Sequence, residues 1–211
     1  MSPTPRLIAL LVALLAATSV GVQLWLGLSR RPLLDEAWRM ARYFTNLTNV
    51  LVALTFLRIA LGWRPSAWWS AGLTLWIVIV GVVYHALLSR DLSGLRWWTD
   101  LGQHSAVPVA VVLWWLAFAP KHGLGPRHAV LWLSWPLVYV AYVLVRGTMD
   151  GRHPYFFVDP GRLGWDGVAL WSMGLGVGFW LAGLGVVLLA QRLGRSAPSM
   201  KRDDPAGPEA G

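Results

Sequence analysis

Four hydrogen-bonding side chains fall within five positions at the beginning of an apolar segment. They are Thr45, Asn46, Thr48 and Asn49. If the segment is a helix, Thr45, Thr48 and Asn49 lie on one face, because residues three and four positions apart are neighbours on a helix. Polar side chains are costly in an apolar helix without partners, so this face indicates either contacts between helices or a functional site.

A histidine and a carboxylate stand at helical spacing near the beginning of a later apolar segment. Asp100 precedes His104 by four residues, so on a helix the carboxylate can orient the imidazole. Pro108 follows His104 by four residues and cannot donate a hydrogen bond to the His104 carbonyl. We therefore expect the helix to open or kink beside the imidazole.

A hydroxyl, an imidazole and a carboxylate are the parts of a nucleophile, a base and a group that orients the base. In this interpretation Thr45 attacks a carbonyl carbon and His104 removes its proton. Free N–H groups at the beginning of the helix also face the oxyanion. The alternative interpretation is structural, with the polar face bonded to a neighbouring helix and His104 at the interface. The supporting or oxyanion-stabilising candidates are Asn46, Thr48, Asn49 and Asp100.

Six apolar runs are long enough to cross a bilayer, which needs about 20 residues. They cover residues 7–28, 43–61, 68–88, 101–119, 129–145 and 168–190. The composition agrees, since 56% of the residues are hydrophobic and only 13% are charged. We therefore predict an all-α polytopic membrane protein. Residues 1–190 form a bundle of six transmembrane helices, and residues 191–211 form a disordered basic tail.

Six spans alternate in direction, so the beginnings of spans two and four and the ends of spans three and five meet one aqueous face. Thr45 and His104 each lie two or three residues inside their spans and therefore at similar depth. Other polar residues on this face could contact a substrate. These candidates are Tyr43, His85, Arg146, His153, Tyr155 and Asp159.

The composition also excludes several classes of site. The absence of cysteine excludes disulfides, thiol nucleophiles and thiolate metal sites. His85, His104 and His153 lack the spacing of a metal or haem site, so we predict no metal and no cofactor. The net charge of +8 does not indicate nucleic acid, because the basic residues form no stripe with aromatic residues. Membrane lipids are the predicted partners, since several of the 15 tryptophans lie at span ends.

The distribution of charge predicts the orientation in the membrane. Nine Lys and Arg residues lie on the side of the termini and nine on the other side, whereas seven of the ten acids lie opposite the termini. The net charge is therefore +6 on the side of the termini and +2 opposite. We expect a multi-pass protein of the bacterial cytoplasmic membrane with cytoplasmic termini.

Three short motifs carry a resemblance to a known family. They are Arg42-Tyr43-Phe44-Thr45, His104-Ser105-Ala106-Val107-Pro108, and Arg146-Gly147 followed by His153-Pro154-Tyr155-Phe156-Phe157-Val158-Asp159. In these motifs, and in their order over residues 7–190, the chain resembles bacterial members of the six-helix family related to the androgen-induced and androgen-dependent TFPI-regulating membrane proteins. The animal members hydrolyse fatty acid esters of hydroxy fatty acids with a threonine nucleophile and a histidine. The resemblance implies that Thr45 is the nucleophile and His104 the base.

Two functions follow from these observations. The first is an intramembrane threonine hydrolase of fatty acid esters. The second is a non-enzymatic membrane protein that binds or transports a lipid or another small molecule. The middles of the spans are almost purely apolar, which disfavours transport of ions or sugars and favours an amphiphile with its head at the interface.

Overall fold

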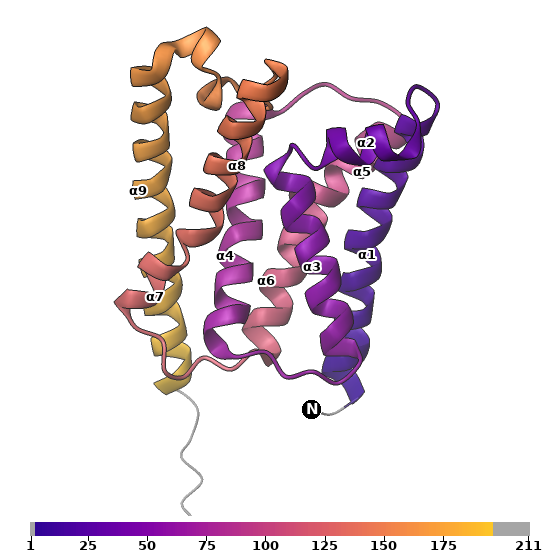
Figure 1. The fold of residues 1–211 in the computed structure, drawn as a ribbon. Coiled ribbons are helices and arrows are strands. Elements are labelled where there is room, and N and C mark those ends of the chain that lie inside the picture. The colour runs from indigo at the N-terminus through magenta and orange to yellow at the C-terminus, as the bar shows by residue number, and fades with distance from the viewer. Residues whose placement is uncertain (1–2, 196–211) are drawn as a thin grey trace, which may run out of the picture.

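The computed structural model describes residues 3–195, and within this range the chain is helical and contains no strand (Figure 1). Residues 196–211 of the predicted tail lie outside the described residues. The helices are α1 (Pro3–Leu28), α2 (Leu33–Met40), α3 (Phe44–Ala60), α4 (Ala67–Val83), η1 (Tyr84–Leu88), α5 (Leu95–Leu101), η2 (Gly102–Ala106), α6 (Val107–Phe118), α7 (Pro126–Leu131), α8 (Ser134–Asp150), η3 (Phe156–Val158) and α9 (Pro160–Arg195).

Five helical segments between residues 3 and 195 are long and apolar enough to cross a membrane. A sixth candidate crossing is α3, which reaches the required length only together with α2, and the two helices meet at 100°. Both ends of the described chain lie at the same end of the bundle (Figure 1). The structure confirms the predicted all-α polytopic membrane bundle. The five segments are Pro3–Leu28, Ala67–Leu88, Leu95–Phe118, Pro126–Asp150 and Pro160–Gly194.

The last two spans extend beyond the predicted ranges. Helix α8 continues past residue 145 to Asp150. Helix α9 covers Pro160–Arg195 but is broken at Gly164 (φ 70°, ψ 167°), so its continuous part begins after Gly164 rather than at residue 168. Helix α9 also runs to Arg195, where the sequence analysis placed a disordered tail. Gln191 in these last turns donates a side-chain hydrogen bond to the carbonyl of Leu124, 3.0 Å away. This hydrogen bond ties the last turns of α9 to the bundle. The polar composition of residues 191–195 did not predict such a contact.

Helix α2 lies across one end of the bundle rather than within a span (Figure 1). Its sequence is amphipathic at helical spacing. Glu36 and Met40 are buried against the bundle, whereas Leu33, Leu34 and Trp38 are exposed. Apolar residues on the outer face of such a helix suit the interfacial region of a bilayer. Helix α2 thus covers the end of the bundle on which the predicted site lies.

The bend between α2 and α3 is held by side chains of α8. Tyr43 has an extended backbone (φ −97°, ψ 128°), so the chain changes direction after α2 and α3 begins at Phe44. Helix ends leave backbone carbonyls without partners, and here α8 supplies the donors. The beginning of α3 is therefore fixed by tertiary contacts. The hydrogen bonds run from Tyr139 to the carbonyl of Arg42 (2.8 Å), from Tyr142 to that of Ala41 (3.3 Å) and from Arg146 to that of Trp38 (2.7 Å).

Two short π-helices, η1 and η2, interrupt neighbouring spans at the same end of the bundle. In η2 the N–H of Val107 donates to the carbonyl of Gly102, five residues earlier. The opening predicted beside His104 is therefore present, and Pro108 accounts for it because it cannot donate to the His104 carbonyl. That carbonyl lies 2.7 Å from the position that a Cβ on Gly81 would occupy, so only glycine allows this close approach.

The core of the bundle lies among α1, α3, α4 and α6. Small residues at helical spacing on α1 (Ala9, Ala13 and Ala16) are buried and allow α1 to lie close to α3. A second apolar cluster lies between α8 and η3, and partly buried residues of α9 pack against it. Its buried members are Tyr139, Val143, Phe157 and Val158.

Candidate active site

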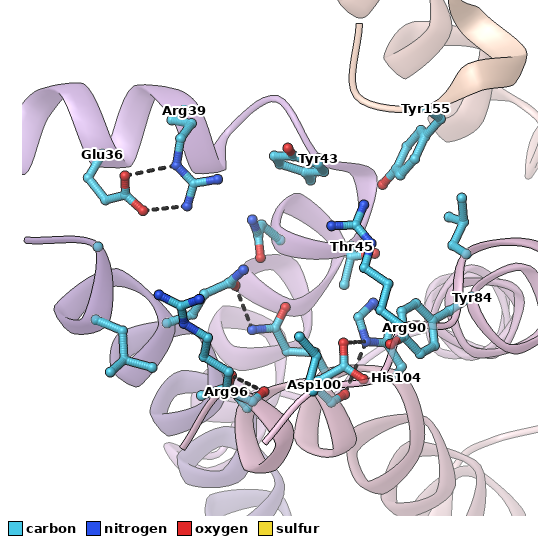
Figure 2. A pocket seen from close by; sticks show the side chains of 18 of the residues that line it. Glu36, Arg39, Tyr43, Thr45, Tyr84, Arg90, Arg96, Asp100, His104 and Tyr155 are labelled. Carbon is cyan, nitrogen blue, oxygen red and sulfur yellow. Dashed lines mark hydrogen bonds and ion pairs between the residues drawn. The ribbon is translucent and has the colours of Figure 1, made fainter. Parts of the chain in front are cut away.

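A cavity of about 580 Å³ opens at the end of the bundle that α2 covers (Figure 2). Its lining comes from the end of α1, from α2, from the first turn of α3, and from the segment that runs from η1 to η2. Loop 151–159 adds one side chain, Tyr155. Six of the residues predicted for the site line this cavity. They are Tyr43, Thr45, Asn46, Asp100, His104 and Tyr155.

His104 is held by a carboxylate and by an aromatic ring. Its Nδ1 lies 3.0 Å from the carbonyl of Asp100 and 3.2 Å from the carboxylate Oδ1 of the same residue. The imidazole stacks on Tyr84, with ring centroids 3.6 Å apart and planes 13° apart. Both acceptors favour a proton on Nδ1, which leaves the lone pair of Nε2 free to accept a proton. The Asp100 carboxylate is thus placed to orient the imidazole, as the four-residue spacing of Asp100 and His104 predicted.

Thr45 lies in the first turn of α3, where helix N–H groups have no partner inside the helix. The phenol of Tyr155 lies against this turn, beside Thr45 and Phe44, and lines the same cavity as Thr45. Figure 2 shows the Tyr155 hydroxyl directed towards Thr45. Burial raises the pKa of the Tyr155 phenol, and hydrogen bonds from Thr45 partly offset this rise. Tyr155 therefore keeps its proton at neutral pH and remains a hydrogen-bond donor beside Thr45.

Thr45 and His104 line the same cavity, but among residues 3–195 no hydrogen bond joins them. In this structure the hydroxyl of Thr45 interacts with Tyr155 instead. The predicted nucleophile and base are thus brought to one cavity without contact between them. Catalytic hydrogen bonds are often formed only when a substrate is bound.

The polar face of α3 divides into two parts. The Thr48 hydroxyl accepts a hydrogen bond from the indole of Trp135 at 3.1 Å. Asn49 is fully buried and donates to the carbonyls of Thr45 (2.9 Å) and Gln103 (3.4 Å). Neither Thr48 nor Asn49 lines the cavity. For these two residues the structural interpretation fits, because they join α3 to its neighbours rather than face a substrate.

Four other predicted residues lie away from the cavity. His85 is exposed and bonds to the hydroxyl of Ser105 at 2.9 Å. Arg146 is buried beneath Trp38, with its guanidinium 3.8 Å from the ring centroid, and secures the bend before α3. The remaining two residues, His153 and Asp159, contact each other, with Nδ1 of His153 3.4 Å from Oδ1 of Asp159. Alternating spans predicted their side of the membrane, but the packing of the loops decides which side chains reach the cavity.

A second hollow adjoins the first one and is apolar. It measures about 140 Å³ and lies among α3, α4, α8 and α9. Its walls are formed mainly by aliphatic and aromatic side chains such as Val83, Leu175 and Phe179. Thr45 and Tyr155 line both the polar cavity and this apolar groove. The two residues therefore mark the place where a polar compartment meets an apolar one.

Several residues of the cavity were not among the predicted site residues. Arg90 reaches it from the segment between η1 and α5, Arg96 reaches it from the first turn of α5, and Gln103 lies beside His104 in η2. Gln103 donates to Gln23 of α1 at 2.8 Å. A sequence signal exists for the two glutamines, because each interrupts an apolar run. Nothing in the local pattern distinguishes the two arginines from other basic loop residues.

Comparison with protein-family models, with curated proteins and with solved structures finds no match for this chain. The resemblance to the six-helix family therefore rests on its three sequence motifs. Membership of that family stays a prediction.

Proposed function

We propose that this membrane protein hydrolyses lipid esters, with Thr45 as the nucleophile and His104 as the base. The observation that carries the proposal is the position of Thr45 at the junction of a polar cavity and an apolar groove. An ester of a fatty acid has the same division, with an acyl chain on one side of the ester group and a more polar part on the other. The chain lies in the groove, and the ester carbonyl lies beside the Thr45 hydroxyl.

Each step of the reaction has a group in the cavity. Nε2 of His104 takes the proton of the Thr45 hydroxyl while its oxygen bonds to the carbonyl carbon, which requires the two groups to approach within about 3.2 Å. The developing oxyanion accepts hydrogen bonds from N–H groups at the beginning of α3 and from the phenol of Tyr155. The imidazolium then gives its proton to the leaving alcohol. Water, activated by His104, hydrolyses the acyl ester of Thr45 and restores the hydroxyl.

A fluorophosphonate probe tests the nucleophile directly. Purified wild-type protein is expected to be labelled, and Thr45→Ala is expected to lose both the labelling and the turnover of long-chain esters. His128→Ala is the matched control, because His128 lies at the opposite end of the bundle, where it binds Gly125. Ester turnover that survives Thr45→Ala at the wild-type rate would contradict the assignment.

A second function, binding of an amphiphile without reaction, is favoured by one observation. The Thr45 hydroxyl interacts with Tyr155 and has no hydrogen bond to His104 among the described residues. A protein that only binds would need no contact between Thr45 and His104. Failure of the wild-type protein to hydrolyse any of a broad panel of lipid esters, in the presence of measurable lipid binding, would support this function.

The proposed location is the bacterial cytoplasmic membrane, with the termini in the cytoplasm. Support comes from the net charge of +6 on the side of the termini against +2 opposite. The cavity then opens on the outer face of that membrane. A C-terminal fusion to a reporter that fluoresces only in the cytoplasm is expected to be bright, and a dark but fully inserted fusion would mean the inverse orientation.

A further inference from the structure

The cavity contains more positive charge than its own carboxylates can balance. Five arginines and two carboxylates line it. Glu36 is paired with Arg31 and with Arg39, and Asp100 is paired with His104. Among residues 3–195, three of the lining arginines thus have no carboxylate partner. They are Arg30, Arg90 and Arg96.

These three arginines come from separate parts of the chain. Arg30 follows α1, Arg90 follows η1, and Arg96 lies in the first turn of α5. Figure 2 shows Arg90 and Arg96 extending into the cavity, with the guanidinium of Arg90 towards Tyr43 and Tyr155. The guanidinium of Arg90 therefore faces the junction at which the apolar groove begins, and all three arginines are exposed at this end of the bundle.

A guanidinium group binds carboxylate and phosphate through paired N–H donors, and such charge-assisted bonds are stronger than neutral ones. We propose that this cavity binds the anionic head group of an amphiphile, a carboxylate or a phosphate, while its hydrocarbon chain lies in the apolar groove. The inference rests on the proposed function in one respect: if the protein is a hydrolase, its substrates are negatively charged esters. Binding of the anion does not itself require Thr45 to react.

The test compares three ligands with one chain length and different heads: hexadecanoate, hexadecyl phosphate and hexadecanol. Full-length protein in a neutral detergent is titrated with each ligand, and binding is followed by calorimetry and by tryptophan fluorescence. The two anions are expected to bind, and hexadecanol is expected to bind at least tenfold more weakly. A stronger response to one anion than to the other identifies the head group that the cavity prefers.

Two charge-matched double variants place the binding in the cavity. Arg90→Gln with Arg96→Gln is expected to weaken anion binding about tenfold or more, because the charge-assisted hydrogen bonds to the anion are lost. The control is Arg64→Gln with Arg127→Gln, which removes two exposed arginines at the opposite end, one from the loop between α3 and α4 and one from the first turn of α7. It is expected to leave binding unchanged. Circular dichroism and gel filtration establish that both double variants are folded. If the variant with Arg90→Gln and Arg96→Gln does not fold, Arg30→Gln is tested in its place.

The outcomes separate this inference from the proposed function. Equal binding of hexadecanol and the anions would overturn it, as would an equal loss of binding in the cavity pair and in the control pair. The same titrations in Thr45→Ala are expected to show full anion binding. If no ester is hydrolysed but selective anion binding is found, the anion site stands and the hydrolase proposal falls. If charged and uncharged esters are hydrolysed at the same rate and bound equally, the hydrolase proposal stands and the anion site falls.

Discussion

The two ends of the bundle use similar polar residues in different ways. At the end where the described chain starts and finishes, polar side chains donate hydrogen bonds to backbone carbonyls at helix ends and in loops. At the other end His104, Asp100 and several arginines surround a cavity, and α2 lies across it (Figures 1 and 2). The bonds at the first end run from Lys121 to the carbonyls of Trp115, Leu116 and Ala119, from Arg6 to that of Ala60, and from Gln191 to that of Leu124.

This difference shows what distinguishes a structural histidine from a candidate base. His128 closes the first turn of α7 by bonding to Gly125, and its ring also lies near Trp132. His104 uses one nitrogen to bind Asp100 and lines an open cavity. A polar group that caps a backbone is expected to affect stability, whereas one that faces a cavity is expected to affect function.

The largest effect is expected for the pair at the centre of the cavity. Thr45→Ala and His104→Ala should each abolish ester turnover while the protein stays folded. The double variant should be little worse than either single one, because both groups act in one step. Initial rates of long-chain ester hydrolysis test this, and additive losses in the double variant would contradict a shared step.

A smaller loss is expected when only a hydrogen-bond donor is removed. Tyr155→Phe keeps the ring that lines both compartments but removes the O–H beside Thr45, so kcat should fall about a hundredfold, the effect of one oxyanion donor, with little change in KM. Tyr142→Phe is the comparison variant: its phenol bonds to the Ala41 carbonyl at the bend before α3 and supplies no donor to the cavity, so kcat should fall less than in Tyr155→Phe. An unchanged kcat in Tyr155→Phe would remove Tyr155 from the mechanism.

Gly81 provides a way to disturb His104 without touching the cavity directly. A methyl group at this position would lie 2.7 Å from the His104 carbonyl, so Gly81→Ala should shift η2, destabilise the protein by about 1–3 kcal/mol and lower turnover. Gly178→Ala is the control, since its added Cβ would meet no atom within 4 Å. Thermal unfolding and turnover are measured for both variants. Equal effects of the two substitutions would show that the close approach of Gly81 to the His104 carbonyl does not matter for stability or turnover.

The smallest effect is expected at the opposite end. Lys121→Met removes three hydrogen bonds to carbonyls at the end of α6, so it should lower stability by about 1 kcal/mol. Turnover per folded molecule should not change. A loss of turnover beyond the loss of folded protein, measured at a temperature well below unfolding, would contradict the separation of the two ends.

Much of the architecture is determined by local patterns. Runs of about 20 apolar residues specify membrane helices, because every backbone polar group in lipid must be bonded within its own segment. Alternation of such helices places Thr45 and His104 at one end of the bundle. The helical period places Asp100 beside His104, and Pro108 accounts for the open helix next to it.

Only the tertiary structure decided which of these residues face a common space. Thr45 lines the cavity, while Thr48 and Asn49, from the same turns of the helix, bond to Trp135 and Gln103. The bend before α3, the reach of loop 151–159 and the gathering of arginines from three segments likewise depend on contacts between distant parts of the chain. Helical periodicity relates residues three or four positions apart, but a cavity forms where packed helices and loops leave space, and sequence spacing does not record that space.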